Sequence, residues 1–321
     1  MLLATSPWAR TKLNGRVLNS RDCLVSPHLH LEQRFWEFPV SLTLILLLVA
    51  SLYLRGWISV RALSATALPA WKASSFFLGL MLIWTAWGSP LAVYDHSLLT
   101  AHMIKHLLLM TFAPPLILLG EPIRMIWNVM PRLAQNILGH MSRQPLVQRV
   151  TRTATRPGLC LIVSTLTLLA WHLPALFTLC VHSKIWHTVE QVTFLGAGIL
   201  FWWPVIQPWP TASTGPRWST LLYLFLATLP CDILSGFLVF SDSVAYPVYL
   251  SAPRMFGFSV LEDQQCAAAL MWTSVTLVYL VPAAIISMRL LAPQTSDGHD
   301  LTRPQSDSAV RQIDSRSLGV V

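Results

Sequence analysis

The chain has 321 residues, of which 54% are hydrophobic and only 11% are charged. Soluble domains carry roughly 25% charged residues, so the composition excludes an ordinary soluble enzyme or binding domain. The net charge of +8 would suggest nucleic acid as a partner of a soluble protein, but here the basic residues lie between apolar runs and form no basic–aromatic module. We therefore expect an all-α, polytopic integral membrane protein that is surrounded by a lipid bilayer and binds no nucleic acid.

The apolar runs predict about seven transmembrane helices in one bundle, because runs near or above ~20 residues can cross a bilayer. Hydrocarbon offers no partners for backbone polar groups, so these runs must be helical. The predicted spans are 38–57, 74–93, 98–119, 159–181, 184–206, 218–240 and 264–290. They divide the chain into a polar N-terminal segment (1–37), a seven-helix membrane domain (38–291) and a tail predicted to be disordered (292–321).

The distribution of lysine and arginine predicts the orientation. The loops near 58–73, 121–157 and 207–217 share one face with the C-terminal tail, and that face carries twice as many basic residues as the other. The loop 121–157 alone holds six arginines and no lysine. By the positive-inside rule, the C-terminus is cytoplasmic and the N-terminus lies outside.

Ionisable side chains inside the predicted spans are the most informative feature, because such groups are costly in hydrocarbon and mark cavities or functional sites. The seven are His102, Lys105, His106, His172, His187, Glu190 and Asp232. With a rise of ~1.5 Å per residue, all of them fall in the outer half of a ~30 Å hydrocarbon core. Polar residues at the outer mouth of the predicted bundle are Asp95, His96, His182, Asp242, Glu262 and Asp263.

His102 and His106 are four residues apart on one helix face, a spacing with which two imidazoles can bind one metal ion. Imidazole combined with thioether or thiolate favours Cu(I). We therefore predict a copper site at His102, His106, His172 and His187, with supporting or soft ligands among Met103, Cys231, Asp232, Glu190 and Lys105.

Simpler interpretations compete with this site. A single histidine in a span is more often a hydrogen-bonding residue between helices, and methionine and cysteine are usually packing residues. Lys105 is expected to neutralise Glu190 or Asp232 as a buried pair, and Pro114 and Pro115 are expected to kink or end the third span. The five cysteines contain no CxxC pair and predict neither a disulfide framework nor a zinc site.

Several short segments form a wider pattern. They are AHMIKHLLLM at 101–110, APP at 113–115, LGEP at 119–122, WHLP at 171–174, Trp186-His187 with Glu190, FSD at 240–242, Tyr246-Pro247 and LEDQQ at 261–265. Together they resemble the signature of the multi-spanning CtaG-type cytochrome c oxidase assembly factors, over about residues 75–290. The resemblance implies a bacterial plasma-membrane protein that helps to mature the copper centres of a haem–copper oxidase. Its implied partners are oxidase subunits and another copper chaperone.

The resemblance also implies functional roles for particular residues. The family's paired histidines correspond to His102 and His106, its later histidines to His172 and His187, and its acidic pair to Glu262 and Asp263. Lys105 departs from the pattern, because a neutral residue is expected between the paired histidines. A cation there disfavours bound copper unless an acidic side chain pairs with it.

We expect an assembly factor rather than an enzyme, since the sequence offers no activated nucleophile, phosphate-binding loop or acid–base pair in a soluble pocket. One alternative is a b-type haem protein that carries electrons, with axial histidines such as His106 and His172 on different helices. Another is an ion or metal transporter, which would favour a mid-membrane site and internal repeats that this sequence lacks.

Overall fold

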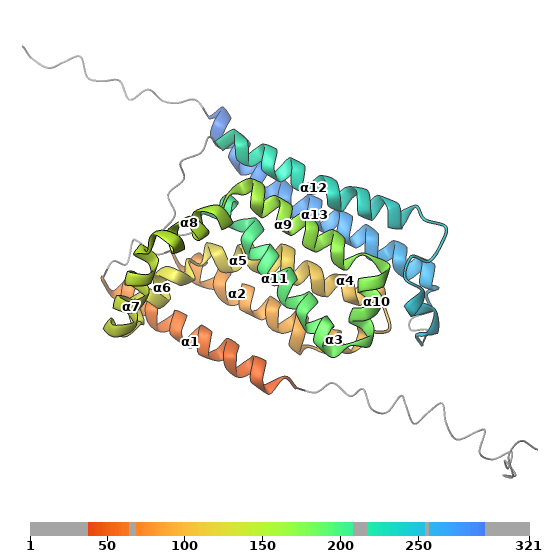
Figure 1. The fold of residues 1–321 in the computed structure, drawn as a ribbon, viewed down its shortest axis with the longest axis horizontal. Coiled ribbons are helices and arrows are strands. Elements are labelled where there is room, and N and C mark those ends of the chain that lie inside the picture. The colour runs from red at the N-terminus through yellow and green to blue at the C-terminus, as the bar shows by residue number, and fades with distance from the viewer. Residues whose placement is uncertain (1–37, 64–68, 208–216, 254–256, 293–321) are drawn as a thin grey trace, which may run out of the picture.

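The computed structural model describes residues 38–63, 69–207, 217–253 and 257–292, so the predicted N-terminal segment and C-terminal tail lie outside the described residues. Within the described ranges the chain forms helices and turns and no strand, which confirms the all-α prediction. The long helices pack side by side in one elongated bundle (Figure 1). They are α1 (Val40–Leu63), α2 (Ala70–Gly88), the continuous run from α4 (Leu99–His106) through η1 (Leu107–Phe112) to α5 (Ala113–Leu119), α9 (Pro157–Trp171), α11 (Lys184–Ile206), α12 (Arg217–Val239) and α13 (Val260–Leu291).

Five stretches of the described chain are long and apolar enough to cross a membrane, and a bent pair provides a sixth. The five are α1, the run 99–119, α11, α12 and α13; the sixth joins α8 (Pro145–Ala154) to α9 at an angle of 63°. The predicted span 74–93 corresponds to α2, which falls short of the same criterion and contains Lys72 and three tryptophans. The structure therefore supports a polytopic membrane protein but does not confirm the count of seven.

The predicted span 159–181 is not one helix. It breaks after Trp171, because Leu173 precedes Pro174 and a residue before proline is driven out of the α region. Leu173 is accordingly extended, and a short α10 (Pro174–His182) follows. The break leaves His172 at the C-terminal end of α9, where its backbone carbonyl accepts a hydrogen bond of 3.1 Å from the Tyr246 hydroxyl.

The third predicted span does not end at its prolines. Proline has no N–H, and its ring crowds the carbonyl four residues earlier, so Pro114 and Pro115 cannot continue ordinary α-helical bonding. The backbone widens into the π-helix η1, in which the Ala113 N–H bonds to the Leu108 carbonyl, and then continues as α5. Single-turn π segments are frequent at functional sites, and this one follows His106 directly.

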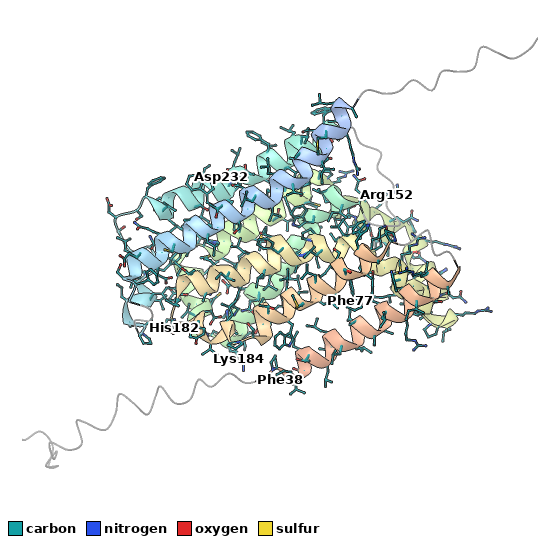
Figure 2. The ribbon with its side chains drawn as sticks, turned by 180° about the vertical axis from the view of Figure 1, so that it is seen from behind. Phe38, Phe77, Arg152, His182, Lys184 and Asp232 are labelled. Atoms are coloured by element: carbon teal, nitrogen blue, oxygen red, sulfur yellow. The ribbon has the colours of Figure 1, made fainter. Side chains whose placement is uncertain are left out.

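The two ends of the bundle differ in chemistry. Figure 2 shows Arg152 and His182 at opposite ends of the molecule. We call the end with the short α3 (Leu91–Tyr94), α10 and the 3-10 helix η2 (Pro247–Ser251) the histidine end. The other, the arginine end, carries α6 (Pro122–Val129), α7 (Arg132–Arg143) and α8.

The long connection 121–157 is therefore helical, and α7 and α8 expose both arginines and large apolar side chains such as Leu133 and Leu146. At its start Glu121 accepts hydrogen bonds from Lys72 and from Arg124, the latter at 3.3 Å. Burial opposes ionisation of Glu121, but the hydrogen bond and charge of Lys72 outweigh it and hold the pKa of this carboxyl below its usual range. The ion pair joins α2 to α6.

Helix α11 lies unusually close to η1, because Gly198 faces that backbone. A Cβ at Gly198 would lie 2.6 Å from the Met110 carbonyl oxygen and 2.7 Å from the Pro114 ring. Real contacts to a Cβ atom are longer than this, so only glycine permits the approach. The same helix carries His187 and Glu190 toward its N-terminal end, and it therefore places them beside α4.

Candidate metal site

Helix α4, which carries His102 and His106, is anchored by a residue far away in the sequence. The Asp263 carboxylate at the start of α13 accepts hydrogen bonds from the Leu99 N–H at 2.6 Å, the Thr100 N–H at 3.1 Å and the Thr100 hydroxyl at 2.6 Å. The first N–H groups of a helix have no partner within it, and a carboxylate that accepts from them stabilises the helix start. Asp263 thereby fixes the depth of α4 relative to α13.

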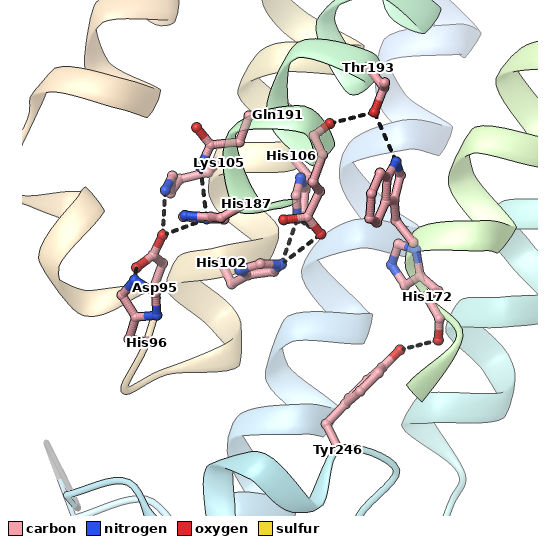
Figure 3. Close-up of polar contacts among 12 residues, drawn as sticks. Asp95, His96, His102, Lys105, His106, His172, His187, Gln191, Thr193 and Tyr246 are labelled. Carbon is pink, nitrogen blue, oxygen red and sulfur yellow. Dashed lines mark hydrogen bonds and ion pairs between the residues drawn. The ribbon is translucent and has the colours of Figure 1, made fainter. Parts of the chain in front are cut away.

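His102, His106 and Glu190 form a compact buried group, which we call the triad (Figure 3). The Nε2 atoms of the two histidines lie 2.6 Å apart, and each lies 3.5 Å from Oε1 of Glu190. The exposed fractions are 2% for His102, 6% for His106 and 0% for Glu190. The predicted histidine pair is thus joined by a carboxyl group from another helix.

The triad fits a metal ion. Protein ligands bind such ions at about 2.0–2.2 Å, so two ligands of one ion lie roughly 3–4 Å apart. Each histidine Nε2 has this spacing from Oε1 of Glu190, whereas the two Nε2 atoms, hydrogen-bonded to each other at 2.6 Å, must separate to bind one ion. All three ligand atoms lie within 4.8 Å of one another. Both carboxyl oxygens of Glu190 and Nδ1 of His106 are buried without a hydrogen-bond partner in the described part of the chain. A buried polar group left in this way costs about 1–3 kcal/mol, and a bound cation would satisfy the carboxyl group.

Aromatic side chains pack against both histidines of the triad. The ring centroid of Phe177 lies 4.9 Å from that of His102, and the ring centroid of Phe194 lies 4.2 Å from that of His106. The Trp171 indole donates to the Thr193 hydroxyl at 2.9 Å, which in turn donates to the Glu190 carbonyl at 2.8 Å. These contacts restrict the side chains of the triad and hold α11 in register with α9.

A second group of possible ligands, which shares His102, lies next to the triad. Asp95, His102 and His187 also bring their ligand atoms within 4.8 Å of one another. The Asp95 carboxylate accepts from Lys105 and lies 3.2 Å from Nε2 of His187. The predicted pairing of Lys105 with Glu190 or Asp232 is therefore wrong, because its partner is Asp95.

The charge on Asp95 is well stabilised. Burial opposes its ionisation, but the hydrogen bond with His187 and the positive charge of Lys105 outweigh that effect and hold the pKa of Asp95 below its usual range. The pair balances the Lys105 cation between the two histidines of α4. The departure from the expected neutral residue is thus compensated locally. An open pocket at the histidine end is lined by His96, His182, His187 and Lys105, and it leads to this group.

Other predicted site residues have different surroundings. His172 is buried but belongs to neither group of ligands, and Met103 and Cys231 line a neighbouring cavity with it. Asp232 and Asp242 join no metal-sized group among the described His, Cys, Asp and Glu residues. Glu262 is exposed and forms a capping box with Ser259 at the start of α13.

Sequence reasoning overlooked two tyrosines of the 241–263 connection. The Tyr249 hydroxyl donates to the Asp95 carbonyl at 2.8 Å, and that of Tyr246 donates to the His172 carbonyl at 3.1 Å. The Tyr246-Pro247 pair was a signal of sequence resemblance only, and nothing in it indicated these partners. The connection therefore positions one residue of the second ligand group and one residue of the neighbouring cavity.

The chain was compared with known families and proteins. Residues 51–292 match the family model described as cytochrome c oxidase caa3 assembly factor (Caa3_CtaG). The chain belongs to this family. The match confirms the resemblance noted in the sequence and covers every member of the triad.

Named relatives are distant. An uncharacterised protein of Mycobacterium bovis is 23% identical over 267 residues, which cover 78% of this chain and 39% of the relative. An uncharacterised protein of Mycobacterium leprae is 22% identical over 279 residues, which cover 82% of this chain and 40% of the relative. The chain thus spans about two fifths of the length of these relatives. No solved structure gives a significant match.

Proposed function

We propose that this chain binds copper at the triad of His102, His106 and Glu190 and delivers it to a subunit of a haem–copper cytochrome c oxidase. The observation that carries the proposal is the triad itself, whose two imidazoles and one carboxyl group are buried within metal-ligand distance of one another. Membership of an oxidase assembly family supports an oxidase subunit as the recipient of the copper, since a haem–copper oxidase needs copper to mature. The ion is cargo, and the chain acts without catalysing a reaction.

The histidine end supports a direction of loading. The open pocket at that end is lined by His187 and Lys105, which both contact Asp95, and Asp95 and His187 form a ligand group with His102. In the proposed topology the chain lies in the bacterial plasma membrane, with its N-terminus outside and its C-terminus in the cytoplasm, as the arginine-rich connection at the other end favours. Copper then arrives from the outer side, carried by another chaperone or as a small complex.

The test is copper content and Cu(I) affinity of the full chain, purified in detergent, beside a His102→Ala/His106→Ala double variant. A matched control is His140→Ala, which removes an exposed histidine that lies in neither ligand group and does not line the open pocket. We expect tight copper in the native protein and in the control, and at least a tenfold loss of affinity, about 1.4 kcal/mol, in the triad variant. Competition with Zn(II) tests whether the triad prefers copper to zinc, because imidazole and carboxylate ligands also suit zinc.

Unchanged copper binding in the triad variant contradicts the proposal. A Soret band in the same sample would instead support the b-type haem alternative. Copper-dependent ion flux in proteoliposomes would support a transporter.

A further inference from the structure

A narrow cavity lies beside the triad, enclosed by α4, η1, α9, α11, α12 and α13. Its walls are mostly apolar, but they include the His172 imidazole and four sulfur-bearing side chains. The four are Met103, Met110, Cys231 and Met271. This wall unites residues that are up to 168 positions apart in the chain, so no local sequence pattern could have indicated it.

His172 presents an unused lone pair. Its side chain is only 7% exposed, and its Nδ1 lies 2.7 Å from the Leu168 carbonyl oxygen. A carbonyl cannot donate, so Nδ1 carries the proton and Nε2 is left as an acceptor. Nε2 is buried and has no hydrogen-bond partner in the described part of the chain. Histidine ligands of metals almost always have this arrangement, in which the other ring nitrogen donates to a carbonyl or carboxylate.

The surrounding sulfur atoms define what this nitrogen would bind. Methionine and cysteine alone are ordinary packing residues, but a neutral nitrogen acceptor in an apolar wall is costly without a partner. Thioether and thiolate ligands together with imidazole are typical of Cu(I), which tolerates low coordination numbers and low polarity. The Cys231 sulfur lies 3.8 Å from the Ser235 hydroxyl, a hydrogen-bonding distance for sulfur. The hydroxyl can donate to the sulfur when the sulfur is a ligand.

We propose that the chain holds a second metal position, a Cu(I) site formed by His172 Nε2 and sulfur ligands from Cys231 and the cavity methionines. This second position rests on the proposed function, because copper would reach it after binding at the triad. Met103 and His106 line both this cavity and the small pocket around the triad. An ion can therefore move from the triad to the sulfur position by ligand exchange, without oxidation or reduction and without leaving the protein.

The sulfur position also lies toward the lipid-facing side of the bundle. Thr165 and Pro230, which line the cavity, also line an apolar groove between α9 and α12. Exposed side chains such as Ile233 and Phe237 form the rest of that groove. Copper released from the sulfur position is therefore close to a surface that faces the bilayer, where a membrane-embedded oxidase subunit would meet the chain.

The experiment titrates Cu(I), with a competing chelator, into the full chain and two double variants in lipid nanodiscs. His172→Ala/Cys231→Ser removes the sulfur position. His102→Ala/Glu190→Gln removes the triad without touching a residue of the cavity wall. Cys180→Ser is a matched control, because Cys180 is buried but does not line the cavity. X-ray absorption at the copper edge distinguishes sulfur from nitrogen and oxygen ligands in each sample.

We expect about two Cu(I) per native chain and about one in each double variant. Copper–sulfur scattering should be present in the native protein, the triad variant and the control, and lost in His172→Ala/Cys231→Ser. One Cu(I) per native chain that the triad variant loses, with no sulfur scattering, overturns the second position and leaves the proposed function intact. One Cu(I) that only the His172/Cys231 variant loses supports the second position and overturns the triad.

Two further results are decisive. Absence of Cu(I) binding in the native chain overturns both proposals. If His172→Ala/Cys231→Ser does not fold, the triad variant still decides, because copper–sulfur scattering at one Cu(I) in a chain without the triad requires a second position.

Discussion

Glu190→Gln is the sharpest test of the triad, because it should raise the stability of the metal-free protein and reduce the further stabilisation by copper. Without metal, both carboxyl oxygens of Glu190 are buried and lack a hydrogen-bond partner in the described structure. Glutamine has nearly the same shape, cannot ionise, and carries an amide N–H that can compete for the accepting Nε2 of the His102–His106 hydrogen bond, since each Nε2 lies 3.5 Å from Oε1. Relief of unsatisfied buried groups is worth about 1–3 kcal/mol, so the metal-free variant should be more stable than the native chain.

Copper should stabilise the variant less than the native chain. The variant loses one of three ligands and the charge that balances the cation, so we expect Cu(I) to bind at least tenfold more weakly, a loss of about 1.4 kcal/mol. A ligand present at 100 times its dissociation constant stabilises the native state by about 2.7 kcal/mol. About half of that gain should be missing in a variant that binds tenfold more weakly.

Thermal unfolding in detergent, followed by tryptophan fluorescence with and without Cu(I), measures both effects. Glu262→Gln is the matched control, because that carboxylate is exposed and belongs to neither ligand group. If Glu190→Gln lowers the stability of the metal-free protein and leaves the copper-induced shift unchanged, Glu190 is a structural residue and the argument for the triad fails.

Three other variants test residues that hold the helices and charges of the site in place. Gly198→Ala places a Cβ against the η1 backbone and should cost about 1–3 kcal/mol by overpacking, with weaker copper binding; Gly196→Ala, on the same helix with open space around it, should be neutral or slightly stabilising. Asp263→Ala removes the cap of α4 and should cost about 0.5–2 kcal/mol in unfolding free energy, while Asp263→Asn restores much of the stability and the copper affinity. Asp95→Asn breaks a buried ion pair and should cost about 3–5 kcal/mol at neutral pH. Because the pKa of folded Asp95 lies below its unfolded value of about 3.9, this contribution is present above that value and is lost as pH falls below it. Unfolding curves of native and Asn proteins should therefore converge in acid and differ at pH 7.

The sequence was sufficient for the class of the protein and for the two paired histidines of the triad. Long apolar runs leave helices as the available structure in hydrocarbon, whatever their partners, and the spans at 184–206 and 218–240 match α11 and α12 within one residue. The spacing of His102 and His106 depends only on the period of one helix, so their proximity was predictable. The predicted helix boundaries were wrong where a proline interrupts an apolar run. Pro174 divides the predicted fourth span into two helices.

The tertiary structure alone decided which polar residues meet. Glu190 joins the histidines because Gly198 lets α11 approach η1, and Lys105 pairs with Asp95 because the turn before α4 folds back on it. Four histidines predicted in the outer half of the membrane are separated into different surroundings, with His172 among sulfur side chains rather than in the triad. Depth along a helix follows from residue number, whereas the direction in which a side chain faces its neighbours depends on how the helices rotate and pack against one another.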